Sequence, residues 1–333
     1  MVGVLVFASS VAMQNALDPA GPFAGRIDGL TRLMVYLLSA IFVIVMIVLA
    51  IAAFRRRHHA PESKTHNDVI QPEHEREKRI SRTVTTGVAL SVAILFALLV
   101  SSYLVGRAIY SSPKTNAMII EVNGRQWWWD VRYLHPIPSQ IVTTANEIHI
   151  PVGRPVLLRL GSGDVIHSFW VPNLHGKMDM IPGRTQELSI QADRPGVYRG
   201  QCAEYCGHQH AHMAIVVIAE PEDQFNSWYQ AQLQPAVTPS TESQTYGQKV
   251  FLSKPCVMCH RIQGTDAGGE VGPDLTHVAS RQTIAAGTLH NTREHLARWI
   301  VNSQSVKPGN RMPPIPVQGN DLNSLLDYVQ SLK

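Results

Sequence analysis

The strongest pattern in the sequence is a pair of long apolar runs in its first third. Residues 33–54 form a run of 22 residues without a charge, and residues 83–106 form another of 24. About 20 apolar residues in a helix cross the roughly 30 Å of hydrocarbon in a bilayer. A buried helix of a water-soluble protein usually keeps a polar face, which neither run has. The pattern therefore predicts a transmembrane helical hairpin over residues 31–108.

The segment between the two runs is basic. Residues 55–82 contain eight Lys or Arg residues, and an excess of these residues marks a loop that stays in the cytoplasm. Both termini are then expected on the outer side of the membrane. Residues 1–30 precede the hairpin. Their apolar start, with Ser10 and Ala12, resembles the remnant of a signal peptide, although the basic residues that open such a peptide are missing.

Short segments of β-branched residues follow the hairpin and partly alternate between apolar and polar positions. Gly, Pro and Asn separate them, which is typical of a β-sandwich or a small barrel. The segments are residues 117–123, 154–160, 165–171, 186–191 and 214–219. We assign them to one domain over residues 109–232. Residues 233–243, LQPAVTPSTES, are rich in Pro, Ser and Thr and predict a linker.

The pattern becomes helical after the linker. In residues 320–333, NDLNSLLDYVQSLK, leucines and a valine recur at helical spacing, with Asn320 as the expected N-cap. Residues 292–302 follow the same rule. These segments predict a small all-α domain over residues 244–333. The net charge of the whole chain is only +4, and no stripe of basic and aromatic residues accompanies it, so we expect no nucleic-acid partner.

Residues 256–260 read Cys-Val-Met-Cys-His, which is the attachment signature of a c-type haem. In such a site Cys256 and Cys259 form thioethers with the vinyl groups, and His260 binds the iron. The alternatives are a disulfide, a thioredoxin-like pair or half of a zinc site. A thioredoxin-like pair lacks its βαβ context here, and a zinc site lacks further ligands at short spacing.

Met312 is the expected sixth ligand of this haem. It is the only methionine after His260, and prolines follow it in GNRMPPIP. Met–His ligation suits an electron-transfer haem, because both axial positions are filled and the thioether raises the potential. The competing ligands are His277, His290 and His295.

Residues 201–213, QCAEYCGHQHAHM, gather soft metal ligands on one loop. A C-x3-C pair outside the cytoplasm is by default a disulfide. Here, however, Cys206, His210 and Met213 follow one another, and His167 stands at an earlier strand end. Sulfur and imidazole ligands with a weak axial Met are typical of cupredoxin-type copper sites. One such site needs a single cysteine, so two cysteines favour two copper ions bridged by both sulfurs.

Together these motifs resemble subunit II of haem–copper cytochrome c oxidase, in the form that carries a fused C-terminal cytochrome c domain. The resemblance covers residues 30–333, and GPDLTH at residues 272–277 is similar to the loop that supports the proximal histidine. It implies a multidomain membrane protein with a two-helix transmembrane hairpin, a cupredoxin-like β-sandwich or barrel and an all-α class I cytochrome c domain.

The resemblance also implies a dinuclear CuA centre. Its expected ligands are His167, Cys202, Glu204 (through the backbone carbonyl), Cys206, His210 and Met213. Both cysteines would bridge the coppers. His167 and Met213 would complete one copper, and His210 and Glu204 the other. The two remaining histidines of the loop are expected to be exposed.

Three further roles follow from the resemblance. In GRQWWWD, Trp127 would be the point at which electrons enter, whereas Trp128 is expected only to pack the sandwich. MDMIPGR is similar to the segment that faces subunit I, where the Glu204 side chain would reach a magnesium ion, with Asp179 nearby. Glu77 is one candidate for the glutamate near a proton-uptake entrance. The Trp and Pro that usually follow that glutamate are absent here, so the acids around Glu77 are alternatively a solvated helix end.

The implied function is that of an electron-transfer subunit of a terminal respiratory oxidase in a bacterial inner membrane. Electrons from an external cytochrome or another small donor protein would pass through haem c and CuA to a haem in subunit I. Subunit I and further membrane subunits are the expected partners. A copper chaperone would instead carry its histidine after the cysteines, a quinol-oxidising homologue would lack the copper ligands, and nitrous oxide reductase has no such hairpin.

Overall fold

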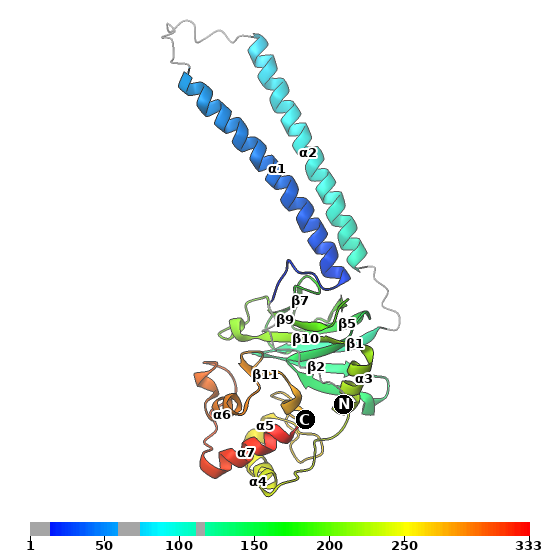
Figure 1. The fold of residues 1–333 in the computed structure, drawn as a ribbon, viewed down its shortest axis with the longest axis vertical. Coiled ribbons are helices and arrows are strands. Elements are labelled where there is room, and N and C mark those ends of the chain that lie inside the picture. The colour runs from blue at the N-terminus through cyan, green and yellow to red at the C-terminus, as the bar shows by residue number, and fades with distance from the viewer. Residues whose placement is uncertain (1–13, 59–73, 111–116) are drawn as a thin grey trace, which may run out of the picture. The chain divides into compact units, whose positions relative to one another are not determined.

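The computed structural model describes residues 14–58, 74–110 and 117–333 of the 333-residue chain (Figure 1). These residues fall into two compact units. One contains residues 26–58 and 74–110, and the other contains residues 14–25 together with 117–333. The first unit holds the predicted hairpin. The second holds both the sandwich and the C-terminal domain, which therefore form one body.

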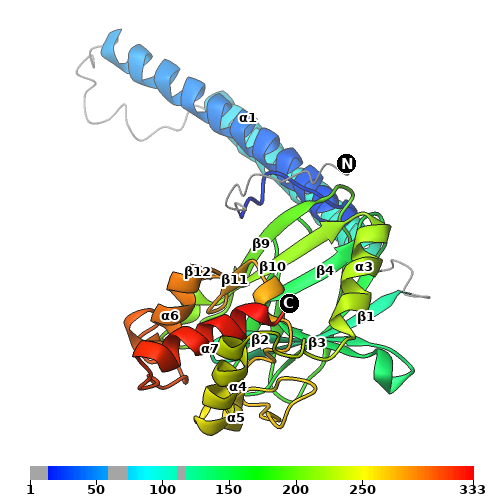
Figure 2. The same ribbon diagram turned by 60° about the horizontal axis from the view of Figure 1, so that its bottom comes forward.

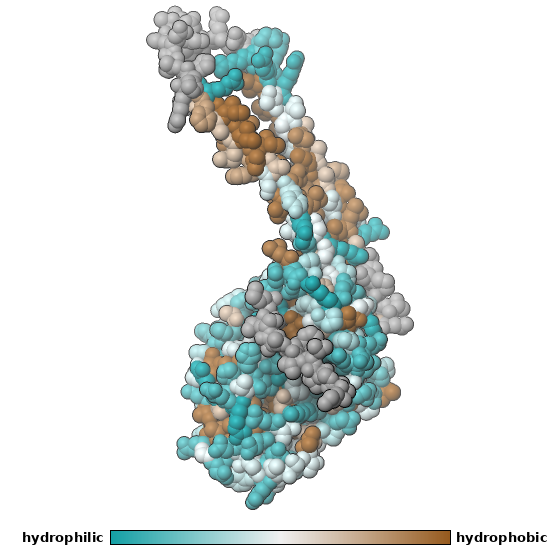
Figure 3. All heavy atoms as spheres, viewed as in Figure 1, coloured by the Kyte–Doolittle hydropathy of each residue, from teal (hydrophilic) through white to brown (hydrophobic). Residues whose placement is uncertain are grey.

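The hairpin unit consists of two long helices, α1 (Pro22–His58) and α2 (His74–Tyr110). Each contains a stretch long and apolar enough to cross a membrane, and no part of that stretch is buried among the described residues. Phe42 and Phe96, for example, are 64% and 65% exposed, and Figure 3 shows hydrophobic side chains along both helices. Side chains of this kind suit lipid or other apolar helices. The two predicted apolar helices are confirmed and fit a membrane protein, and residues 59–73 of the predicted loop lie outside the described residues.

The second unit contains a sandwich of two five-stranded sheets (Figures 1 and 2). The strands of the first sheet are, in spatial order, β3 (Val142–Ala145), β2 (Trp128–Leu134), β1 (Met118–Arg125), β5 (Val156–Ser162) and β8 (Gln186–Ile190). Those of the second are β4 (Glu147–Pro151), β10 (Ala214–Glu220), β9 (Gly196–Cys202), β6 (His167–Trp170) and β7 (Met178–Met180). Each sheet has one parallel pair, β1 with β5 and β4 with β10, among antiparallel neighbours. The prediction of a cupredoxin-like sandwich is confirmed.

The core of the sandwich is built from alternate residues of its strands. Ile120 and Val122 of β1 are fully buried, and so are Trp129 and Val131 of β2. Successive side chains of a strand point to opposite faces of its sheet, so one row from each strand faces the core. Burying one such side chain contributes roughly 1.5–3 kcal/mol. The helix α3 (Glu222–Gln232) follows β10 and adds Phe225 to the same core.

Residues 14–25 also pack onto the sandwich. Ala20 and Phe23 are only 3% exposed, and the backbone N–H of Ala20 donates to a carbonyl of the sandwich at 2.7 Å. A Cβ at Gly21 would lie 1.9 Å from a backbone oxygen of the sandwich, so the approach requires glycine. This part of the N-terminal segment therefore belongs to the folded domain. Residues 1–13, where the signal-like pattern falls, lie outside the described residues.

The C-terminal domain is helical. Its helices are α4 (Glu242–Ser253), α5 (Cys256–Cys259), α6 (Arg293–Val301) and α7 (Gly319–Ser331). A two-stranded ribbon of β11 (Thr283–Ile284) and β12 (Leu289–His290) lies between α5 and α6 in the chain. The domain's short 3₁₀ turns are η4 (Val278–Ser280) and η5 (Ser303–Ser305), and the sandwich contains two more, η2 (Pro138–Gln140) and η3 (His210–His212). In Figure 2, α4 and α7 lie side by side.

Both helices predicted in this domain are present. α6 lies within residues 292–302, and its N-cap is Thr292, whose hydroxyl accepts from the backbone N–H of His295 at 3.3 Å. α7 buries Leu325, Leu326 and Val329 in the core of the domain. The predicted cap of α7 was wrong. The helix begins at Gly319, so Asn320 lies inside the first turn.

Candidate metal and haem sites

The hairpin of β9 and β10 closes the metal-ligand loop. β9 ends at Cys202, and β10 begins directly after Met213. The backbone N–H of Cys202 donates to the carbonyl of Met213 at 2.9 Å. Cysteine and methionine thus face each other at the base of the loop, and the 3₁₀ turn η3 turns the chain back between them.

His167 comes from the neighbouring strand of the same sheet. It opens β6, which pairs with β9 so that Phe169 lies opposite Cys202. The His167 side chain is fully buried, and its Nε2 lies 2.8 Å from Asp164 Oδ1. Its Nδ1 is left 3.8 Å from Cys202 Sγ. Asp164 therefore orients the ring as carboxylates orient histidine ligands in metal sites.

The two cysteines are not joined to each other. Their Sγ atoms lie 3.7 Å apart, whereas a disulfide needs about 2.05 Å. Cys206 Sγ is also 3.7 Å from His210 Nδ1 and 3.9 Å from Met213 Sδ. The disulfide alternative is thus wrong for this structure, and the thiols instead form the centre of a cluster of soft ligand atoms.

All six expected ligand residues converge on this cluster. The ligand atoms of His167, Cys202 and Cys206 lie within 4.8 Å of one another. The carbonyl oxygen of Glu204 lies 3.2 Å from Cys202 Sγ, so the backbone of Glu204 faces the cluster. The two other histidines of the loop, His208 and His212, are exposed, as expected.

The charges of the cluster favour a cation. Contact with the Cys206 thiol lowers the pKa of Cys202, and the neighbouring Cys202 sulfur raises the pKa of Cys206. Two thiolates this close repel each other, so a positive ion is needed to keep both deprotonated. Burial opposes protonation of His167, but its hydrogen bonds to Asp164 and Cys202 outweigh burial and raise its pKa.

The expected magnesium site is not supported. The Glu204 carboxylate lies 3.4 Å from Lys177 Nζ, and the same ammonium lies 3.8 Å from Asp179 Oδ1. A lysine thus already balances both carboxylates. In residues 14–58, 74–110 and 117–333, the cluster around the two cysteines is the only group of three or more His, Cys, Asp or Glu ligands close enough to hold a metal.

The tryptophan segment contacts the metal-ligand loop. The carbonyl oxygen of Cys206 accepts from Trp127 Nε1 and from Gln126 Nε2, both at 2.9 Å. Trp127 is 8% exposed. The expectation for Trp128 was wrong, because β2 turns Trp129 into the core and leaves Trp128 half-buried outside it.

A cavity of about 750 Å³ lies beside the Cys-x-x-Cys-His motif. Cys256, Cys259, His260 and Met312 all line it. The two cysteines are free thiols on the single helical turn α5, so their spacing of three residues places them on one face of that helix. The volume is in the range of cofactor sites.

A hydrogen bond orients the His260 ring so that it can act as a ligand. Its Nδ1 lies 2.8 Å from the carbonyl oxygen of Pro273, in the loop predicted to support it, and Nε2 is left for a metal. Burial lowers the pKa of His260, so the ring is held in its neutral, ligating form. A Cβ at Gly272 would lie 2.7 Å from the ring, so this contact also depends on glycine.

The candidates for the sixth ligand differ in position. Met312 lines the cavity, whereas the three competing histidines are not among the described residues that line it. The ring nitrogens of His277 lie 2.8 and 3.0 Å from two backbone carbonyl oxygens. His295 Nδ1 lies 2.9 Å from the carbonyl oxygen of His290. These contacts favour Met312.

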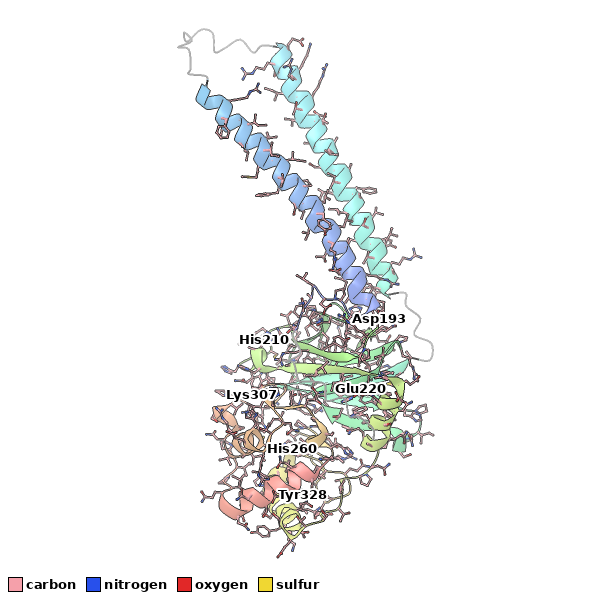
Figure 4. All side chains as sticks on the ribbon, in the orientation of Figure 1. Asp193, His210, Glu220, His260, Lys307 and Tyr328 are labelled. Carbon is pink, nitrogen blue, oxygen red and sulfur yellow. The ribbon has the colours of Figure 1, made fainter. Side chains whose placement is uncertain are left out.

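The sandwich forms another wall of the haem cavity. Gln126, Trp127, Trp128 and Asp164 line it together with residues of the C-terminal domain. The segment that contacts the metal-ligand loop thus also contacts the haem cavity. Figure 4 labels His210 in the first site and His260 in the second, and in this view Lys307 lies between them.

Fold and sites together define a redox protein in which a cupredoxin-like metal centre and a haem domain share one body. Residues 118–220 match the family described as cytochrome c oxidase subunit II, periplasmic domain, and residues 244–333 match cytochrome c. Cytochrome c oxidase subunit 2 of Alkalihalophilus pseudofirmus is 33% identical over 330 residues, covering 96% of this chain and 91% of the relative. This chain therefore belongs to the cytochrome c oxidase subunit 2 family.

The chain is also similar to a second relative and to a solved structure. Cytochrome c oxidase subunit 2 of Bacillus subtilis is 24% identical and covers 100% of this chain and 96% of its own length. Among solved structures, the periplasmic domain of cytochrome oxidase subunit II from Bradyrhizobium japonicum is 30% identical. It covers 36% of this chain and 95% of its own, with a TM-score of 0.34.

The residues present fit the redox groups that the two families imply. For the dinuclear copper, two unpaired sulfurs, two imidazoles, a thioether and a carbonyl converge, which is a donor set suited to copper. For the haem, two free cysteines and His260, whose Nε2 is available, line the same cavity. The two apolar helices, with the match to a periplasmic domain, fit a membrane protein.

Proposed function

We propose that this chain receives electrons for a terminal respiratory oxidase. In this proposal electrons from an external donor protein reach subunit I through a haem c and a dinuclear copper centre held by this chain, and oxygen is reduced to water in subunit I. The observation that carries the proposal is the pair of unjoined sulfurs 3.7 Å apart, flanked by His167 and His210. When bound, the copper pair and the haem each take up and release single electrons.

The ligand assignment is part of this proposal. Cys202 and Cys206 would bridge the two coppers. His167 and Met213 would complete one copper, and His210 with the Glu204 carbonyl would complete the other. The support is that each of these ligand atoms lies within 4 Å of one of the two sulfurs.

The haem assignment follows the same logic. Cys256 and Cys259 would hold the porphyrin covalently, and His260 and Met312 would be its axial ligands. Trp127 is the point at which the copper centre receives electrons. This role is supported by two contacts of Trp127: its indole donates to the carbonyl of Cys206, and the residue lines the haem cavity.

We further propose that both redox domains face the periplasm of a bacterial inner membrane. The basic residues between α1 and α2 support a cytoplasmic loop. The helices would pack against subunit I and further membrane subunits, since their apolar side chains are exposed in the isolated chain. The external donor would be a cytochrome or another small electron-transfer protein.

The order of reduction tests the proposal. In the purified oxidase complex, an external cytochrome should reduce the haem c before the copper. A Cys256→Ser, Cys259→Ser double variant, which cannot attach the haem, should retain copper but lose rapid reduction by that donor. Reduction of copper at the wild-type rate in this variant would show that electrons reach it without the haem domain.

A further inference from the structure

The haem domain meets the sandwich through two segments. In the first, the buried Glu147 carboxylate accepts the backbone N–H groups of Thr283 at 2.9 Å and Gln282 at 3.2 Å. In the second, residues 307–311 lie against the metal-ligand loop, where Gln209 Nε2 donates to the carbonyl of Pro308 at 2.6 Å. We call residues 307–311 the clamp loop. It directly precedes Met312.

Lys307 is the first residue of the clamp loop, and it is buried. Lys307 is only 2% exposed. Its ammonium donates to the Trp127 carbonyl at 3.1 Å and to the Ala285 carbonyl at 3.2 Å. Burial lowers the pKa of Lys307 to about 7. A lysine is rarely buried without a strong structural reason, because desolvation of its charge is costly. Here the two acceptors belong to different domains, so the side chain ties them together.

Arg311 forms a second tie at the edge of the same loop. Its guanidinium donates to Gln126 Oε1 at 2.7 Å and lies 3.8 Å from Asp164 Oδ2. Gln126 in turn donates to the carbonyl of Cys206, and Asp164 holds His167. Arg311, next to Met312 in the chain, is therefore linked through these two residues to both Cys206 and His167. Both contacts are made by the same guanidinium nitrogen, Nη2 of Arg311.

We propose that Lys307 and Arg311 are positioning residues that hold the Met312 loop of the haem domain against Gln126, Trp127 and Asp164. They keep the haem cavity at a fixed place relative to the copper ligands. This inference rests on the proposed function. It adds that specific hydrogen bonds fix how the two domains pack, in addition to the linker of residues 233–243 that joins them in the chain.

The test compares three variants in the full oxidase complex. Lys307→Met keeps a long apolar stem but removes both hydrogen bonds, and Arg311→Gln removes the outer tie. Lys249→Met is the matched control, because Lys249 is exposed on α4. Hydrogen exchange is measured over residues 126–129 and 282–287, and the rate of electron transfer from haem c to copper is measured after light-triggered reduction.

Lys307→Met should increase exchange in both segments and slow the transfer by about tenfold or more, because the carbonyls of Trp127 and Ala285 lose their donor. Arg311→Gln, at an exposed position, should slow it about two- to fivefold. The haem absorption bands and the copper EPR signal should not change, since no ligand is altered. Lys249→Met should match the wild type.

Exchange and transfer equal to those of Lys249→Met in both interface variants would overturn the proposal. If Lys307→Met does not assemble, the outcome for Arg311→Gln decides. A wild-type complex without a copper signal or haem bands would contradict the proposed function. The exchange comparison would still decide whether the clamp loop holds the domains together.

Discussion

At the scale of single residues, side chains outside the ligand set hold the proposed copper ligands in place: Asp164 contacts His167, and Gln126 donates to the Cys206 carbonyl. The spacing of Cys202, Cys206, His210 and Met213 within one loop is visible in the sequence. Asp164 could have been noticed three residues before His167. The contacts of Gln126, Lys307 and Arg311 join segments 80 to 185 residues apart, and no local pattern indicates them.

Asp164 is expected to be essential for tight copper binding. The Asp164→Asn substitution keeps the size of the side chain but removes the charge that orients and polarises His167. Copper affinity should fall about 10- to 100-fold, as is typical when the hydrogen-bond partner of a ligand is lost. The fraction of copper that the protein retains in the presence of a chelator measures this loss of affinity. Asp193→Asn, an exposed change in the same domain (Figure 4), is the control and should behave as the wild type; equal retention in both variants would contradict the role.

Cys206 is expected to be indispensable for the copper centre but not for the haem. In Cys206→Ser, a hydroxyl replaces the bridging sulfur, and copper-linked oxidase activity should be abolished. The haem should still attach, because Cys256 and Cys259 are intact. Activity and haem spectra of the purified complex report the two effects. A delocalised copper EPR signal that survives in the variant would refute the ligand assignment.

At the scale of elements, the sequence pattern identified some strands of the sandwich and missed others, among them β3 and β4, which also contain β-branched residues. β1, β5, β6, β8 and β10 correspond to predicted segments. β2 and β9 were missed because Trp, Tyr, Arg, Gly and Asp residues obscure their alternation, although the inward side chains of β2 are buried at every second position. Their place in the sheets comes from pairing with neighbours, which local sequence does not encode.

The loop that carries Met312 is the element most directly tied to the haem potential. In Met312→Ala the haem should remain attached through Cys256 and Cys259, but its midpoint potential should fall, because a thioether ligand raises the potential. A redox titration of the haem absorption bands measures the change. Val301→Ala shortens an apolar side chain of the same domain that is 37% exposed and is not among the described residues that line the cavity, so it serves as the control. An unchanged potential in Met312→Ala would assign the axial position to another residue.

The strand β4 makes the stability of the domain pair depend on pH. Burial raises the pKa of Glu147, although the hydrogen bond from the Thr283 backbone opposes part of the rise. The folded chain then binds this proton more tightly than the unfolded chain. The free energy of unfolding should therefore fall as the pH rises from 4.5, the ordinary value for glutamate, to the raised pKa.

Glu147→Gln should remove that part of the pH dependence. The test compares the thermal unfolding midpoints of the wild type and the variant, measured on the full chain at a series of pH values that rise from the ordinary glutamate pKa. The midpoint of the wild type should decline more steeply than that of the variant. Parallel curves would mean that Glu147 has the same pKa in both states.

At the scale of the whole molecule, the chain combines a membrane hairpin with one body that contains both redox domains. The hairpin and the two site motifs were predictable because hydrophobic run length and ligand spacing are local properties. The haem cavity wall formed by the sandwich was not, since it arises only when residues 125–128 meet the C-terminal domain. Packing of one domain against the other thus forms this wall of the cavity, which the motifs alone do not indicate.

The orientation of the hairpin gives a further test at this scale. A membrane-impermeant thiol reagent should label Ser240→Cys in intact cells, because that exposed position follows the sandwich. It should label Ser63→Cys only after the membrane is opened. The reverse pattern would place the redox domains in the cytoplasm and contradict the proposed topology.

The copper content and EPR spectrum of the oxidised wild-type complex test the central claim most directly. We expect two copper ions per chain in addition to any held by subunit I, with one unpaired electron shared between them. A sample in which Cys202 and Cys206 are joined as a disulfide, without that copper and without the shared-electron signal, would contradict the account.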